Sequence, residues 1–145
     1  MRIHPEPVGA LLHPLHAILL AFPIALFSAG LASDIAYLNT SVIQWSNFSA
    51  WLIAGAELFG GLVLIWAIVC FLTARSRPYR GRALVYLIVV AVMCLAGLLN
   101  AFNHSQDAWS SVGTLGLLLS IVTTILALVA GWIGYAATPV REVGQ

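Results

Sequence analysis

Four apolar stretches, each long enough to cross a lipid bilayer, constrain this chain more than any other feature of its sequence. They run from about residue 16 to 38, from 50 to 74, from 83 to 103 and from 113 to 137. A hydrocarbon core about 30 Å thick needs about 20 apolar residues in a helix. The sequence therefore predicts an all-α membrane protein, a single domain over residues 1–145 in which four transmembrane helices form an up-down bundle.

The scarcity of charge also indicates lipid surroundings. Hydrophobic residues make up 61% of the 145 residues, and charged residues only 8%. An average soluble domain has about 25% charged residues, so this chain lacks the charge that an aqueous surface needs. We expect membrane lipids as its surroundings and no nucleic-acid partner, because basic and aromatic residues do not alternate on a soluble face.

The basic residues are all arginines, and their positions predict the orientation of the protein. They lie near the two ends and in one internal cluster: Arg2, Arg75, Arg77, Arg80, Arg82 and Arg141. Cytoplasmic loops carry an excess of basic residues, which predicts that the connection at 75–82 and both termini are cytoplasmic. The connections at 39–49 and 104–112 are then expected on the outer side.

Small residues at four-residue spacing predict where the helices pack. In lipid, such residues let two helix backbones approach closely. They occur in the first, second and fourth stretches: Ala25, Ala29, Ala56, Gly60, Ala127, Gly131 and Gly134. We interpret them as contacts within the bundle rather than as a ligand site, and any such face left exposed would favour a homodimer.

Three histidines near the N-terminus are candidate ligands. Pro14 suits the first turn of a helix, so His13 is expected near the N-cap and His16 one turn further on the same side. The helix N-terminus favours neutral imidazoles, the form that binds haem or a metal. One hypothesis is a haem b or metal site that uses His13, His16 and His4. The alternative is that these residues cap the helix at the interface, because they lack Cys or carboxylate partners at set spacing.

A haem held between His16 and His104 conflicts with the predicted topology. His16 is expected at the cytoplasmic start of the first helix, and His104 at the outer end of the third. These ends are separated by most of the bilayer, roughly 25–30 Å. A single iron cannot bind both side chains across that distance.

A second set of polar side chains is expected in the outer half of the bundle. Glu57 lies about seven residues into the second stretch, at a depth of roughly 10 Å, where an ionisable group is costly and by default functional. The residues that could converge with it on an outward-facing pocket are Asp34, Asn100, His104, Asp107 and Ser120. A Glu57–His104 pair could bind a cation, move a proton or receive a small polar ligand. Alternatively, Glu57 is protonated or hydrogen-bonded to Asn100 or Ser120 and holds the bundle together.

Three segments resemble DUF2231, a family of small bacterial membrane proteins of unknown function. The first is His13-Pro14-Leu15-His16 with the following Ala-Ile-Leu-Leu-Ala-Phe-Pro, and the others are Asn100 to Trp109 and Ala130 to Gly134. The resemblance implies four transmembrane helices in a bacterial inner membrane, and no established activity. Many relatives have a histidine near the start of the third helix that would suit a haem. This sequence has Arg80-Gly81-Arg82 there, which weakens a haem b assignment.

The chain contains no recognised catalytic motif, so we expect an accessory membrane protein without catalysis of its own. Three hypotheses remain open. The protein is a haem-binding or electron-transfer subunit with a membrane or periplasmic redox partner, a small proton- or cation-linked permease-like module, or a scaffold for assembling another membrane protein.

Overall fold

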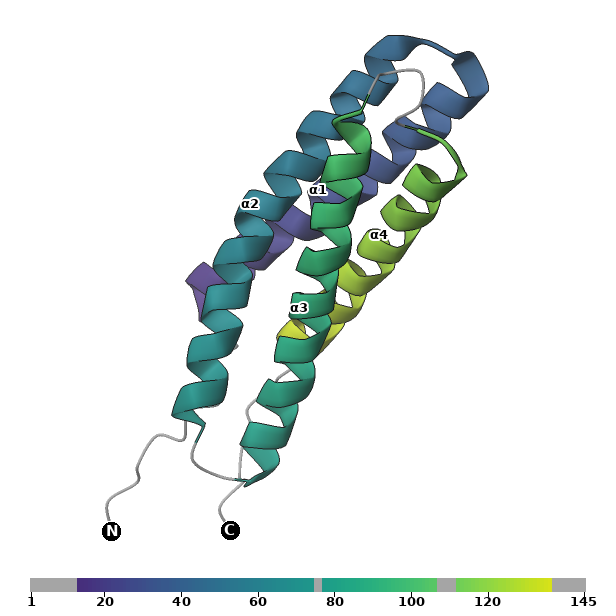
Figure 1. The fold of residues 1–145 in the computed structure, drawn as a ribbon. Helices are drawn as coiled ribbons and strands as arrows, with labels where there is room; N and C mark the ends of the chain where they lie inside the picture. The colour runs from purple at the N-terminus through teal and green to yellow at the C-terminus, as the bar shows by residue number, and fades with distance from the viewer. Residues whose placement is uncertain (1–12, 75–76, 107–111, 137–145) are drawn as a thin grey trace, which may run out of the picture.

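The computed structural model describes residues 13–74, 77–106 and 112–136, which form four long helices (Figure 1). Their bounds are Pro14–Thr40 for α1, Ile43–Thr73 for α2, Arg77–His104 for α3 and Thr114–Tyr135 for α4. All four are long and apolar enough to cross a membrane. Even α4, with 22 residues, spans about 33 Å at 1.5 Å per residue, which matches the hydrocarbon core.

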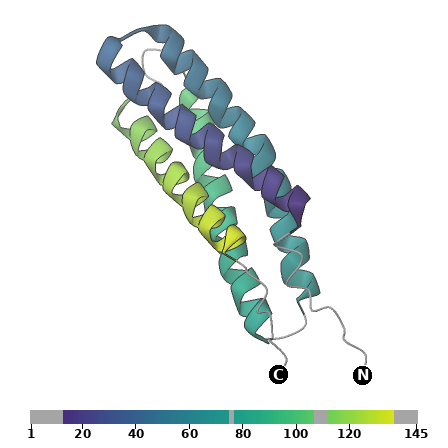
Figure 2. The same cartoon turned by 180° about the vertical axis from the view of Figure 1, so that it is seen from behind.

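The helices run alternately up and down and pack in a closed ring. α1 contacts α2 and α4, and α3 contacts the same two helices. The α1–α2 and α3–α4 connections lie at one end of the bundle, while α2 meets α3 at the other end (Figures 1 and 2). α1 begins and α4 ends on the side of the α2–α3 connection, where α2 and α3 extend further. The prediction of an all-α, up-down bundle of four apolar helices is confirmed.

The outer surface of the bundle is apolar. Trp51 is 76% exposed, Trp132 79% and Leu72 73%. A soluble monomer rarely exposes contiguous apolar surface on this scale, whereas the lipid of a bilayer solvates such side chains favourably. The bundle interior instead contains the polar groups, among them His16, Asp34 and Asn100, each completely buried.

Helix α4 approaches α1 closely through two glycines. A Cβ at Gly131 would lie 2.7 Å from Ile24 Cδ1, and one at Gly134 would lie 2.8 Å from Leu20 Cδ2. A side chain at either position would therefore require the end of the Ile24 or Leu20 side chain to shift. Ala56, Gly60 and Ala127 are also buried, but Ala29 is half-buried and Ala25 is exposed. Ala25 therefore lies on the outer surface of the bundle, while Leu20, Phe27 and Gly30 are among the buried residues of α1.

Helix α2 begins seven residues before the expected start at residue 50. A two-residue connection, Ser41 and Val42, replaces the expected loop, and Ser41 adopts a left-handed conformation with φ 54° while its N–H bonds Tyr37 O at 2.7 Å. The polar residues between 44 and 49 lower the hydropathy, yet they follow a helical period. Ser46 and Ser49 are buried at the spacing that continues to Ile53.

Helix α3 begins at Arg77, inside the segment expected to be a loop. Arginine is a good helix former, and Pro78 is compatible with the first turn of a helix. Arg80 and Arg82 therefore lie on an exposed helical turn, where the Arg80 guanidinium is 5.1 Å from the ring centroid of Phe71. Arg2, Arg75 and Arg141 lie outside the described residues.

Candidate functional site

Asp34 and His104 form a buried pair on the axis of the bundle. Asp34 is near the end of α1, and His104 is the last residue of α3. His104 Nε2 lies 3.0 Å from Asp34 Oδ1, and both side chains are completely buried. Because α1 and α3 are diagonal members of the ring, this contact crosses the bundle interior. It is the only salt-bridge contact within the described ranges.

Helices α3 and α4 extend this pair into a chain of hydrogen bonds. Asn100 Nδ2 donates to Ser120 Oγ at 2.9 Å, and Ser120 Oγ donates to Asp34 Oδ2 at 2.5 Å. The direction of these two hydrogen bonds is fixed because the amide nitrogen of Asn100 can only donate. The single hydroxyl proton of Ser120 therefore points to Asp34. Both oxygens of Asp34 therefore face polar partners, which compensates for its removal from water.

Helix α2 contributes Ser49, which the sequence analysis missed. Ser49 Oγ donates to the carbonyl oxygen of Gly30 at 3.2 Å and lies 3.4 Å from His104 Nε2. Ser49 falls within the predicted loop 39–49, and the early start of α2 at Ile43 is what brings it inward. Side chains from all four helices thus meet at one place, and we call this set the buried network: Asp34, Ser49, Asn100, His104 and Ser120.

The contacts of His104 determine where its protons lie. Nδ1 is 3.0 Å from the carbonyl oxygen of Asn100, which can only accept a hydrogen bond. Nε2 faces Asp34 Oδ1 and the Ser49 oxygen, whose own proton is directed to Gly30. The contacts are met when Nδ1 carries a proton and a second proton lies between Nε2 and Asp34 Oδ1. With this second proton on Nε2, the site is an imidazolium opposite a carboxylate, an ion pair inside the membrane.

Glu57 does not join this pair. The expected Glu57–His104 contact is replaced by Asp34–His104, and Glu57 Oε1 is buried without a hydrogen-bond partner in the described part of the chain. Asn100 bonds Ser120 rather than Glu57. Asp107, the remaining member of the expected pocket, lies outside the described residues.

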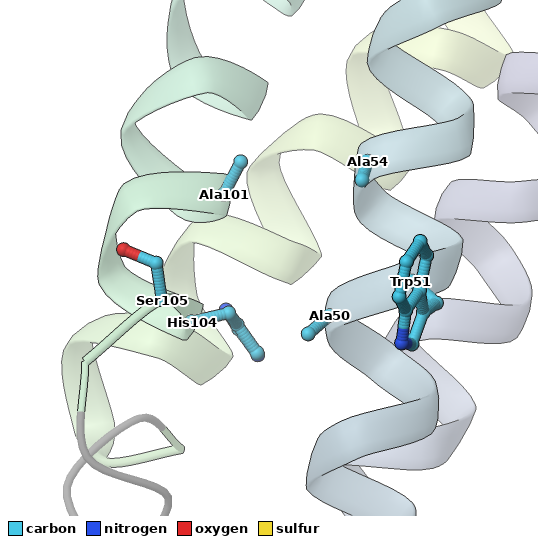
Figure 3. A pocket seen from close by; sticks show the side chains of 6 residues that line it. All are labelled: Ala50, Trp51, Ala54, Ala101, His104 and Ser105. Carbon is cyan, nitrogen blue, oxygen red and sulfur yellow. The ribbon is translucent and has the colours of Figure 1, made fainter.

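A shallow groove between α2 and α3 borders His104. It has a volume of about 240 Å³ and is lined by Ala50, Trp51, Ala54, Ala101, His104 and Ser105. Figure 3 shows the His104 ring pointing from α3 toward Ala50 on α2. His104 itself lines the groove, although its side chain is buried.

The histidines of α1 lie at the opposite end of the bundle. His13 is the N-cap of α1, and its Nδ1 accepts a hydrogen bond from Leu15 N at 3.2 Å. His16 is completely buried, with Nε2 2.8 Å from the Tyr86 hydroxyl. Both rings lie within 6 Å of the Trp66 ring, at 5.5 and 5.7 Å between centroids.

These contacts bear on the haem hypothesis. His16 Nε2 would have to leave Tyr86 to bind an iron, and His4 lies outside the described residues. Within the described ranges, no group of three or more His, Cys, Asp or Glu side chains is placed to hold a metal ion. A haem at His13 or His16 stays a prediction. His16 lies near the start of α1 and His104 is the last residue of α3, and these two helices run parallel, so the two histidines lie at opposite ends of the bundle, as the topology argument required (Figure 1).

Comparison with known proteins identifies the family to which this chain belongs. Searches of curated proteins and of solved structures find no match to it. The family described as "Predicted membrane protein (DUF2231)" matches residues 12–145, which include all four helices and the buried network. This protein is therefore a multi-pass membrane protein of unknown function that belongs to the DUF2231 family.

Proposed function

We propose that this protein is a proton-linked membrane module, of the small permease-like class, and that the Asp34–His104 pair is its proton-binding site. One observation carries the proposal: a fully buried ion pair at which side chains from all four helices meet. Ionisable residues inside a membrane are costly, and they commonly mark ion pathways and proton relays.

The chemistry follows from the charges of the pair. The imidazolium and the carboxylate together are neutral, so the resting pair is tolerated in the bundle interior. A proton added to Asp34 removes the negative charge and leaves the His104 imidazolium buried without its counter-charge. That state favours separation of α1 from α3 at this end of the bundle, which links proton uptake to helix movement.

The proposed direction of proton entry depends on orientation. Arg77, Arg80 and Arg82 lie at the start of α3 and His104 is its last residue, so these arginines are at the end of the bundle opposite to the ion pair. If that end is cytoplasmic, as the positive-inside rule predicts, protons reach Asp34 and His104 from the outer side of a bacterial inner membrane. The groove beside Ala50 and Ala101 is the proposed route.

The test is proton movement through purified protein. The protein is reconstituted into vesicles that contain a pH-sensitive dye, and the outside is acidified. We expect the wild-type protein to acidify the interior faster than empty vesicles. Asp34→Asn and His104→Gln should both return the rate to that of empty vesicles, because each removes one half of the ion pair.

The matched control is Asn39→Ala, which removes an exposed polar side chain from the same helix as Asp34. It should keep the wild-type rate. Helical content and a single size-exclusion peak establish that each variant is folded. A wild-type rate equal to that of empty vesicles, or full rates in both folded variants of the pair, would reject the proposed function.

A further inference from the structure

Glu57 is an ionisable side chain near the middle of α2 that the buried network does not use. Its Oε1 is buried and has no hydrogen-bond partner among the residues that the structure describes. The carboxyl group lies directly against α3 at Gly97. A Cβ at Gly97 would overlap Glu57 Oε1 and would lie 2.8 Å from Glu57 Cδ. The absence of a side chain at residue 97 is what allows the carboxyl group to occupy this position.

No positive charge balances Glu57 in the described part of the chain. The salt-bridge contact there joins Asp34 to His104 and leaves Glu57 out. An ionised carboxylate oxygen without a donor is strongly disfavoured in a low-dielectric interior. A proton on the carboxyl group removes this charge, and it also turns one oxygen into a donor.

Asn100 provides an independent indication that a donor belongs here. Asn100 is completely buried, and its Oδ1 has no hydrogen-bond partner in the described ranges, because its amide nitrogen faces Ser120. Gly97 and Asn100 are three residues apart on α3 and so lie on one face, one turn from each other. Glu57 Oε1 lies against Gly97, and Asn100 Oδ1 belongs to the next turn of α3, so two buried acceptors that lack donors occur in this part of the bundle. A proton on Glu57 adds a donor to this region.

The groove beside His104 leads toward this carboxyl group. Ala50 and Ala54 line the groove from α2, and Glu57 follows them at the spacing i, i+4, i+7 on the same helical face. On α3, Ala101 lines the groove and Gly97 is one turn deeper in the bundle. Seven residues of helix separate Ala50 from Glu57, about 10 Å of depth.

We infer that Glu57 is a second proton-binding site, which holds a proton in the resting protein and is reached between α2 and α3. This second site is separate from the Asp34–His104 pair, because the two sites share no side chain. A proton that enters by the groove reaches the ion pair first and Glu57 one to two helical turns deeper in the bundle.

Carbodiimide labelling tests this assignment. Dicyclohexylcarbodiimide partitions into lipid and reacts with protonated carboxyl groups. The carboxyl proton moves to a carbodiimide nitrogen while the carboxyl oxygen adds to the central carbon, and an oxygen-to-nitrogen rearrangement gives a stable N-acylurea with no leaving group. In reconstituted protein we expect one adduct by intact mass, located by fragmentation on the peptide that contains Glu57.

Two variants and an infrared spectrum distinguish Glu57 from the other carboxyl groups. Glu57→Gln should lose the adduct, and Asp34→Asn should retain it. The infrared band of a protonated carboxylic acid should be present in the wild-type protein and absent from Glu57→Gln. Absence of that band from the wild-type protein, or an adduct that persists in Glu57→Gln, would overturn the inference. Neither the labelling nor the infrared band requires proton flux. The assignment of Glu57 can therefore be rejected while the proposed function stands, and the proposed function can be rejected while the assignment of Glu57 stands.

Discussion

Replacing Asp34 by alanine is expected to lower the free energy of unfolding by about 3–5 kcal/mol, the range for breaking one member of a buried ion pair. The substitution leaves the His104 imidazolium without its counter-charge and the Ser120 hydroxyl without its acceptor. Unfolding of the purified protein in mixed micelles, followed by circular dichroism, measures this change. Asn39→Ala, an exposed polar substitution on the same helix, should change it by less than about 0.5 kcal/mol.

A double-mutant cycle separates the pair from general damage to the bundle. The loss in the Asp34→Ala, His104→Ala double variant should be clearly smaller than the sum of the two single losses. The reason is that the second substitution removes the charge that the first one left unpaired. Additive losses would mean that Asp34 and His104 do not interact in the folded protein.

Gly97→Ala is expected to destabilise the bundle by about 1–3 kcal/mol, the usual range for overpacking a filled interior. The added Cβ would overlap the Glu57 carboxyl group and lie 2.8 Å from Phe27 Cζ, and Phe27 is only 1% exposed. Gly61→Ala is the matched control because nothing lies within 4 Å of its Cβ position. It should be neutral or should stabilise α2 by up to about 1 kcal/mol, since alanine favours helix over glycine.

The cost at Gly97 should also depend on Glu57. In a Glu57→Ala background, Gly97→Ala should destabilise less, because one of the two overlapping groups is gone. Thermal unfolding of the wild-type protein, Gly97→Ala, Glu57→Ala and the double variant in one detergent measures this difference. Equal effects at Gly97 and Gly61 would show that the carboxyl group does not pack against α3 as described.

The architecture was predictable because lipid imposes a simple rule. Every spanning segment must satisfy its own backbone hydrogen bonds, so long apolar stretches become helices. The same rule explains why the helix starts were misplaced. Hydropathy detects the most apolar stretch of each helix, while α2 and α3 continue past that stretch through polar residues such as Ser46, Ser49 and Arg80, which remain compatible with a helix.

The composition of the site could be anticipated better than its pairing. Asp34, Asn100, His104 and Ser120 were expected at one end of the bundle because each lies near the same end of its helix. Which acid meets His104 depends on how each helix is rotated about its axis, and no single stretch of sequence records that rotation. Four uniformly apolar helices give little indication of an inner face. The sequence analysis paired Glu57 with His104, whereas the structure pairs Asp34 with His104.

The contact between His16 and Tyr86 was not anticipated for the same reason. Tyr86 lies within an apolar stretch and has no neighbouring motif. One signal was available, because the start of the first helix and the start of the third lie at the same end of an up-down bundle. Polar side chains at matching depths on those two helices are candidates for pairing.

The protonation state of His104 tests the account most directly. Solid-state ¹⁵N NMR of histidine-labelled protein in lipid bilayers reports whether each ring nitrogen carries a proton, and His104→Gln identifies the signals. The contact with Asn100 O predicts a protonated Nδ1, and the proposed ion pair with Asp34 predicts that Nε2 is protonated as well. A bare Nδ1 would contradict the account, because it would face a carbonyl oxygen that has no proton to offer.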